Sequence, residues 1–338
     1  MTKEEPKPQS LLAKKAESKR PYHGHSVIED PNIGELFRDR ADTMLADLKW
    51  LEQKWEVEFS PFLEIGAGSV QRSAALLNNY PVRGVATDIS INSLKDAPYV
   101  LSLLNYDRFP ILICCDAHYI PFLPNSFNFV FAYQTFHHFE NPKPVFAECF
   151  RILAKDGHLF FNEEPLDSSF RRMLRGERLL SHPPTRIQKF GYRLGVEKVF
   201  WDDGALERSL GMIEARFDLD LWRESLGPFT ILDIEVNRKL KIHSTLKKPA
   251  LNTILSSFVG GNVKGLCVKK GGEYLSGDIR DRLMCLDCYS NQITLINDQQ
   301  MKCKNCQRVY LVSDGVMRMF PKHLEEELFP ENQNWEPK

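Results

Sequence analysis

Apolar positions between residues 62 and 161 form short continuous runs that alternate with segments of helical spacing. The runs occupy residues 62–65, 84–87, 111–115, 129–133 and 158–161. Before the last run, apolar residues from Val145 to Leu153 recur at helical spacing, and we expect a turn at 155–157 to end this helix with Gly157 in the left-handed conformation. Continuous apolar strands that alternate with helices are typical of a parallel sheet covered on both faces. The pattern therefore predicts a doubly wound α/β domain.

Two further regions flank this alternating pattern. Apolar residues recur at three- and four-residue steps from Ile33 to Leu51, which predicts an N-terminal helix. After Pro165 the alternation stops, and a helical, basic segment precedes two more strand-like runs at 231–239 and 263–268. The predicted organisation has five parts: a mobile polar tail (1–30), a main domain (31–165 and 211–272), a helical, basic cap insertion (166–210), a small cysteine-rich module (280–321) and an acidic tail (322–338).

The composition excludes several classes of protein. The chain of 338 residues is 43% hydrophobic, which is enough apolar material for a buried core and argues against a disordered chain. Its 44 Lys and Arg nearly balance its 45 Asp and Glu, so binding to nucleic acid through overall positive charge is not expected. No apolar run is long enough to span a membrane or to act as a secretory signal. The eight cysteines are not spread as a disulfide framework, and we expect a soluble, cytoplasmic protein with reduced thiols.

The first strand-like run ends in a glycine bend at Gly66 and Gly68. Glycine there lets a ligand approach the backbone closely, and the following helix offers free N–H groups at its N-terminus. Asp88 ends the second run and can accept both hydroxyls of a ribose, while Asp116 ends the third and suits an adenine amino group. Gln71 stands where a dinucleotide-binding motif has its third glycine, and no Lys-Ser or Lys-Thr follows the bend, which excludes a Walker-type phosphate loop. The sequence therefore predicts a nucleoside-binding edge.

A series of short motifs in a fixed order makes this prediction more specific. The motifs are Leu63-Glu64-Ile65-Gly66-Ala67-Gly68, Thr87-Asp88, Cys115-Asp116-Ala117, Ile120-Pro121-Phe122, the segment 126–131, His137-His138-Phe139 and the segment 150–157. Together they resemble the class I S-adenosylmethionine-dependent methyltransferases, most closely the small methyltransferase-domain group, over about residues 55 to 165. The resemblance implies a Rossmann-like, mostly parallel sheet and S-adenosyl-L-methionine as cofactor. Two positions depart from the family pattern, which often has a third glycine at Val70 and usually an aspartate at Asn128.

The resemblance also implies which residues contact the cofactor. All of them are placed at the carboxyl ends of the predicted strands. They are Glu64 at the methionine amino group, Gly66, Ala67 and Gly68 in the backbone cradle, Asp88 at the ribose, Ile89 beside the adenine, Asp116 and Ala117 at the adenine edge, and Tyr133 and Gln134 on the methionine and acceptor side.

Methyl transfer from a sulfonium is an in-line displacement in which the protein mainly orients the reactants and excludes water. A general base is needed only where the nucleophile must lose a proton. His137 and His138 follow the fourth run, and Glu163 and Glu164 follow the fifth, so these four are the candidate bases. The alternative for the histidines is backbone bonding or packing under the cofactor, and for the glutamates it is a turn or capping role.

The cap insertion follows the fifth run, where it can cover an acceptor pocket. It is rich in arginine, and Arg171, Arg172 and Arg175 are candidates to clamp a phosphate or carboxylate on the acceptor. The alternative for any one of them is a solvated helix face.

Two C-x-x-C pairs lie near the C-terminus, with 14 residues between them that suit a hairpin. Their residues are Cys285, Cys288, Cys303 and Cys306. Four thiolates fill all positions around a tetrahedral ion, which predicts a structural Zn²⁺ with no open place for water. The segment 283–321 is similar to zinc-ribbon proteins that activate some RNA and protein methyltransferases. Whether the ribbon steadies the catalytic domain or contacts a macromolecular acceptor stays open at this point.

Three functional hypotheses follow from the sequence. The favoured one is methyl transfer to a small-molecule acceptor, with a structural zinc ribbon. The second is a methyltransferase acting on RNA or protein that docks through the zinc ribbon and the basic cap; steep salt dependence of binding would indicate phosphate contacts. The third is a scaffold that binds the cofactor without transferring the methyl group.

Overall fold

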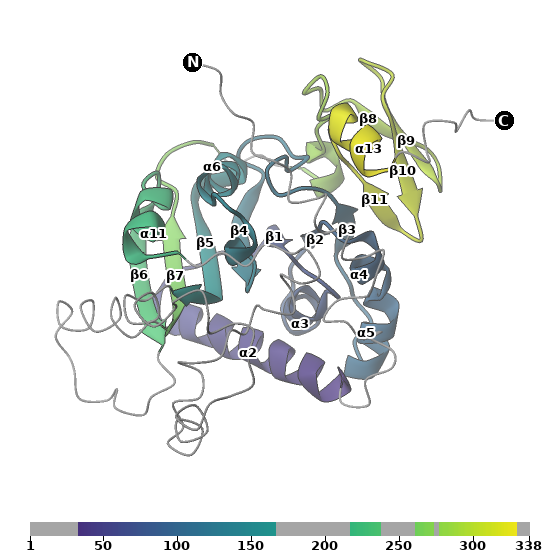
Figure 1. Cartoon of the computed structure of the whole chain (residues 1–338). Helices are drawn as coiled ribbons and strands as arrows, with labels where there is room; N and C mark the ends of the chain where they lie inside the picture. The colour runs from purple at the N-terminus through teal and green to yellow at the C-terminus, as the bar shows by residue number, and fades with distance from the viewer. Residues whose placement is uncertain (1–32, 167–216, 238–260, 274–276, 330–338) are drawn as a thin grey trace, which may run out of the picture.

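The computed structural model describes residues 33–166, 217–237, 261–273 and 277–329 (Figure 1). The predicted tail at 1–30 and the predicted cap beyond residue 166, including its candidate arginines, lie outside the described residues. Within the described ranges the strands form one eleven-stranded sheet in the order β6-β7-β5-β4-β1-β2-β3-β11-β10-β9-β8. The strand bounds are β1 Phe62–Ile65, β2 Gly84–Asp88, β3 Ile111–Cys114, β4 Phe127–Tyr133, β5 Leu153–Leu166, β6 Thr230–Asn237, β7 Gly261–Val268, β8 Ile293–Asn297, β9 Gln300–Cys303, β10 Val309–Ser313 and β11 Val316–Arg318.

The centre of the sheet is parallel, as the sequence predicts. Strand β1 pairs in parallel with β2 and β4, β2 pairs with β3, and β4 pairs with β5. The two later strands expected from the sequence, β6 and β7, pair antiparallel with each other and extend the sheet beyond β5. The result is the Rossmann-like, mostly parallel sheet that the alternating pattern and the motifs predict.

Helices cover both faces of this sheet. The helices are α2 Ile33–Lys54, α3 Gln71–Asn79, α4 Ile91–Lys95, α5 Ala97–Leu104, α6 Lys143–Ile152, α11 Leu219–Ser225 and α13 Lys322–Leu328. Successive residues of β1 pack in different clusters: Phe62 with α2 and α3, and Leu63 with α6 and α11. Because strand side chains alternate between faces, this division is what the continuous apolar run of β1 requires. Among the described residues, no helix is long and apolar enough to cross a membrane.

The turn between α6 and β5 differs from the sequence expectation. Helix α6 ends at Ile152, and β5 begins at the next residue. Asp156, at φ 58°, has the left-handed conformation that was expected of Gly157, so the prediction was wrong by one residue. Gly157 is needed for space instead, because a Cβ there would lie 3.0 Å from the carbonyl oxygen of Ala154 and 3.1 Å from that of Phe127.

The C-terminal cysteine-rich module continues the main sheet. Strands β8 and β9 form the predicted hairpin between the two cysteine pairs, and β11 pairs in parallel with β3 (Figure 1). The first part of the segment expected to be an acidic tail is helix α13 instead, because Leu324 and Leu328 lie four residues apart on one face and are both buried. Residues 330–338 lie outside the described part of the chain.

Candidate functional site

The glycine bend lies where β1 meets α3. Gly66 and Gly68 have φ values of 66° and 52°, which glycine adopts without a steric penalty. A Cβ at Gly66 would lie 2.4 Å from Oγ1 of Thr135, so this position accepts no side chain, whereas Gly68 faces open space. Val70, where the family often has glycine, is also left-handed at φ 71° and precedes α3. The bend therefore keeps the shape of a three-glycine loop although its third member is a valine.

Asp88, at the end of β2, binds the glycine bend directly. Its Oδ2 accepts a hydrogen bond from the backbone N–H of Gly68 at 2.7 Å, and its Oδ1 accepts one from Ser90 at 2.8 Å. The carboxylate is half-buried, and desolvation raises its pKa despite these bonds. Asp88 and the glycine bend are therefore in direct contact, and their shared role in ligand binding stays a prediction.

Glu64, in β1, is buried with one oxygen unused. Its Oε2 accepts hydrogen bonds from both the backbone N–H and the hydroxyl of Ser73, the former at 3.0 Å. Its Oε1 has no partner among the described residues. Burial in this position raises the pKa of Glu64 to about 7. A buried, partnerless acceptor is costly unless a ligand supplies the donor.

Asp116, just after β3, has the same property. Its Oδ1 accepts from the backbone N–H of His118 at 2.9 Å and lies 2.7 Å from Nδ1 of that histidine. Its Oδ2 is buried and has no partner in the described part of the chain. Ala117 and Ile89 are partly buried beside the core. Two unused acceptors, on either side of Asp88 in the sheet, fit a nucleoside ligand with one amine at its aliphatic end and another on its base.

Tyr133 and Gln134 lie where β4 ends, but their side chains bond to different partners. The hydroxyl of Tyr133 donates to Oδ2 of Asp47 in α2 at 2.8 Å, so it faces the helix. Burial first, and the charge of Asp47 second, raise the pKa of Tyr133 well above its usual value. Gln134 is exposed, and its Nε2 donates to Oε2 of Glu163 at 2.8 Å. Of these two side chains, Gln134 is thus the exposed one at the carboxyl edge of the sheet. The hydroxyl of Tyr133 is occupied by Asp47, so Tyr133 can contact a ligand only through its ring.

The four candidate bases separate into two kinds. Glu164 is fully buried: Oε1 accepts from the N–H groups of Thr135 and Phe136 at 2.7 and 3.0 Å, and Oε2 lies 2.9 Å from Nδ1 of His137. Burial disfavours its ionisation, but these bonds outweigh it and lower the pKa of Glu164. Glu164 therefore binds backbone N–H groups of the turn after β4, and the ring of His137 is held by the same carboxylate.

Glu163 and His138 are less buried than their neighbours. The Glu163 side chain is 29% exposed, and its backbone has φ 63°. The ring of His138 packs at 4.1 Å from that of His137 and is half-buried. These two stay candidates for contact with an acceptor.

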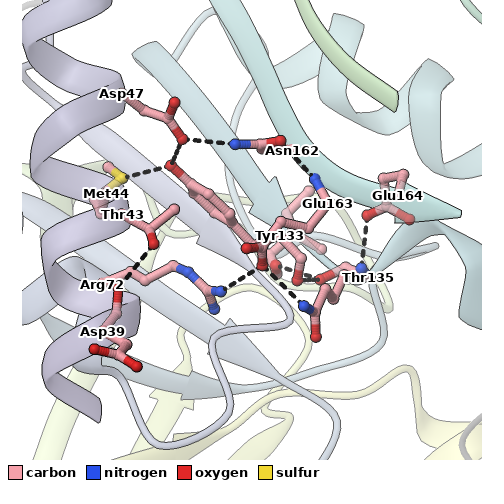
Figure 2. A network of polar contacts seen from close by, with 12 residues as sticks. Asp39, Thr43, Met44, Asp47, Arg72, Tyr133, Thr135, Asn162, Glu163 and Glu164 are labelled. Carbon is pink, nitrogen blue, oxygen red and sulfur yellow. Dashed lines mark hydrogen bonds and ion pairs between the residues drawn. The ribbon is translucent and has the colours of Figure 1, made fainter. Parts of the chain in front are cut away.

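Sequence reasoning missed a network of charged and polar residues that joins α2 to the sheet (Figure 2). Asp47 accepts from Tyr133, from Asn162 at 2.7 Å and from Lys264 at 2.7 Å. Arg72, nearly buried in the first turn of α3, pairs with Glu163 at 3.0 Å. The available signal was a charge inside an apolar pattern: Asp47 in the stripe of α2, and Lys264 in the apolar run of β7.

The four cysteine sulfurs of the C-terminal module converge on one point. Their Sγ atoms lie within 4.8 Å of one another, with separations of 3.6 Å for Cys285–Cys306 and for Cys288–Cys303. Sulfurs around a tetrahedral zinc at about 2.3 Å would be about 3.8 Å apart, so the cluster has a suitable size. The Tyr310 hydroxyl lies 3.2 Å from Sγ of Cys285, at hydrogen-bonding distance for sulfur.

Comparison with known proteins identifies the class of the domain. Residues 63–161 match the family described as a methyltransferase domain (Methyltransf_11). Residues 63–161 therefore have the sequence features of a methyltransferase domain, and a four-cysteine cluster that is compatible with zinc binding follows them. No curated protein matches the sequence significantly.

Three solved structures illustrate the likeness. An inferred methyltransferase from Bacillus halodurans C-125 is 18% identical, with a TM-score of 0.44 over 67% of this chain and 100% of that chain. Geranyl diphosphate C-methyltransferase from Streptomyces coelicolor A3(2) is 10% identical, with a TM-score of 0.45 over 71% and 83%. A complex of the Haloferax volcanii Trm112 methyltransferase activator with a methyltransferase is 15% identical, with a TM-score of 0.42 over 70% and 95%.

Proposed function

We propose that this protein transfers a methyl group from S-adenosylmethionine to a small-molecule acceptor. The observation that carries the cofactor assignment is a pair of buried oxygens that have no partner among the described residues, Oε1 of Glu64 and Oδ2 of Asp116, on either side of Asp88. When bound, the cofactor supplies an activated methyl group on a sulfonium, so the protein needs no nucleophile of its own.

We assign the following roles to the chain's residues, in agreement with their positions at the carboxyl ends of the strands. Glu64 accepts from the methionine ammonium, Asp88 from the ribose hydroxyls and Asp116 from the adenine amino group. Gly66, Ala67 and Gly68 let the backbone approach the cofactor. Ile89 and Ala117 pack against the adenine, and Tyr133 and Gln134 border the methionine end. Glu163 and His138 orient the acceptor or take its proton, while Glu164 and His137 keep the turn after β4 in place.

Charge and surface composition bear on the class of acceptor. The segment 278–329 has seven Lys and Arg against eight Asp and Glu, and four thiolates on Zn²⁺ add a further negative charge. A module of this charge is poorly suited to a phosphate backbone. This disfavours RNA docking through the ribbon and supports a small-molecule acceptor, or a protein one.

A protein acceptor is the second candidate, and one observation favours it. The cysteine module exposes Tyr289, Leu295 and Ile296, at 71%, 62% and 51% of their surface. Exposed apolar side chains that gather on one module are a feature of protein contact surfaces.

Two measurements test the proposal in sequence. Calorimetry with S-adenosylhomocysteine tests cofactor binding, and the absence of binding would overturn the enzyme assignment. Incubation with methyl-labelled S-adenosylmethionine and fractionated lysate then shows whether label enters metabolites, protein or RNA. Label in protein, lost when Tyr289 and Leu295 are replaced by serine, would favour the second candidate. Binding with no label in any fraction would leave a cofactor-binding scaffold.

A further inference from the structure

A nearly buried arginine lies beside the buried acid of the cofactor site. Arg72, in the first turn of α3, is 5% exposed, and Glu64 is 1% exposed. Ser73, the residue after Arg72, holds Glu64 through its backbone N–H and its hydroxyl. Arg72 and the residue that holds Glu64 are thus neighbours in the first turn of α3. The carboxyl group of Glu64 and the cationic side chain of Arg72 therefore both start where β1 meets α3.

The contacts of Arg72 leave part of its hydrogen-bonding capacity unused. Its guanidinium lies over the ring of Tyr133, 4.3 Å from the ring centre, and one NH2 donates to Glu163 at 3.0 Å. Its Nε is buried and has no partner among the described residues. Figure 2 shows the guanidinium beside Tyr133 and Glu163. Buried donors without partners are rare unless a ligand or water completes them.

Two further features favour an anion at this point. The N-terminus of helix α3 adds positive potential here, since its first turn has no acidic residue, although the N–H of Ser73 in that turn already donates to Glu64. A planar guanidinium also matches a carboxylate in geometry. The unused acceptor of Glu64 and the unused donor of Arg72 together are complementary to an ammonium and a carboxylate on one ligand.

We infer that Glu64 and Arg72 form a paired site for the zwitterionic amino-acid end of the cofactor, with Arg72 as the residue that selects for its carboxylate. This inference rests on the proposed function, since it assumes that the cofactor binds at the glycine bend. Glu163 is the counterion that keeps Arg72 in place. The resemblance in sequence assigned the ammonium to Glu64 but gave Arg72 no role.

The experiment compares three ligands that share a 5′-methylthio-adenosine unit and differ in the aliphatic chain on its sulfur, the sulfur being a charged sulfonium only where that chain is present. S-adenosylmethionine has both charged groups, decarboxylated S-adenosylmethionine keeps the amine alone, and 5′-methylthioadenosine has neither. Their dissociation constants are measured by calorimetry for the wild-type chain, for R72Q and for R83Q, which changes an exposed surface arginine as a control. Thermal unfolding checks that each variant is folded. If R72Q does not fold, R72K replaces it in the comparison, because lysine keeps the positive charge but lacks the planar guanidinium.

The wild-type protein and R83Q should bind S-adenosylmethionine at least tenfold more tightly than its decarboxylated form, as expected for a charged hydrogen bond. In R72Q this preference should disappear, while the affinity for 5′-methylthioadenosine stays within about twofold. R72K should show an intermediate preference. If R72Q weakens all three ligands equally, or keeps the preference, Arg72 is a structural partner of Glu163 and the inference is wrong. If the wild-type chain binds none of the three, the proposed function fails and the inference fails with it.

Discussion

At the scale of single residues, folding favours the neutral form of the buried Glu64, whereas binding of an ammonium group favours its ionised form. Burial raises its pKa from the usual 4.5 to about 7, so the folded chain holds a proton more tightly than the unfolded chain does. The protonated Glu64 therefore makes its full contribution to the free energy of unfolding below about pH 4.5, and this contribution is lost as the pH rises through about 7. A difference of that size corresponds to at most about 3 kcal/mol.

We therefore expect E64Q to raise the free energy of unfolding at pH 8 by about 1–3 kcal/mol, because a neutral amide avoids the cost of burying a charge. Urea denaturation measures this effect, and the gain should vanish near pH 4.5. The same variant should bind S-adenosylhomocysteine at least tenfold more weakly, because it lacks the charge that pairs with the ammonium. An E64Q protein that is less stable than wild type at pH 8 would contradict this account.

Cofactor affinity should also depend on pH through Glu64. The groups that face its carboxylate are Ser73 and Arg72 from α3 and Asp88 from β2. Since an ammonium binds the ionised carboxylate, the affinity for S-adenosylhomocysteine should rise with pH up to about 7 and level off above it. Calorimetry at pH 6 in buffers of different ionisation enthalpy should show proton release on binding. Neither effect should occur in E64Q, and their persistence there would assign the titration to another group.

Two positions that depart from the family pattern have physical explanations in the structure. Val70 holds a left-handed conformation that costs a β-branched residue about 1–2 kcal/mol, and its fully buried side chain offsets that cost. Asn128 donates from its Nδ2 to the carbonyl oxygen of Ser60 at 2.7 Å, which an ionised aspartate could not do. Neither compensation is visible in the sequence, because each depends on a neighbour supplied by the fold.

At the scale of elements, helix α13 packs into the same hydrophobic cluster as the glycine bend. Leu324 and Leu328 are buried in the cluster that also contains Ala67 and Val70 of the bend. We expect L328A to lower the free energy of unfolding by about 2–5 kcal/mol, as is usual for a buried leucine, and to weaken S-adenosylhomocysteine binding. L295A is a matched control, since Leu295 is 62% exposed and should change neither value. If L328A destabilises the chain without any change in affinity, α13 does not support the bend.

The elements differ in how well the sequence predicts them. The five central strands, the helix from Ile33 and the hairpin at 293–303 were predicted because each depends on local periodicity and spacing. The pairing of β11 with β3 was not, because it joins residues about two hundred positions apart with no local signal. The Asp47 network was missed for the same reason: its members come from α2, β4, β5 and β7, and each is a single polar residue in an apolar setting. Of the site, the acids and glycines were predictable from motif order, whereas Arg72 needed the structure.

At the scale of the whole molecule, the C-terminal module and the adenine side of the site are built together. Residues leading into the module bind the loop that follows Asp116: the N–H of Met284 donates to the carbonyl oxygen of Pro121 at 3.0 Å, and the N–H of Leu123 donates to that of Arg282 at 2.9 Å. Within α13, His323 packs edge-on against Tyr119, with ring centres 6.2 Å apart. A change in the module should therefore alter the adenine pocket.

Removal of the metal tests this coupling. A small four-cysteine module takes much of its folding free energy from zinc, so chelation or C303S should unfold it. Strand β11 would then leave the sheet, and α13 would leave the hydrophobic cluster into which it packs. Metal and cofactor both favour the same folded arrangement. The chain without metal should therefore bind S-adenosylhomocysteine more weakly and unfold at a lower temperature. Added Zn²⁺ should restore both properties in the wild-type chain but not in C303S. Calorimetry and metal analysis of the same samples measure both properties. A chain that has lost its zinc and its ribbon fold, yet binds S-adenosylhomocysteine with unchanged affinity, would show that the methyltransferase domain holds its cofactor site without the module.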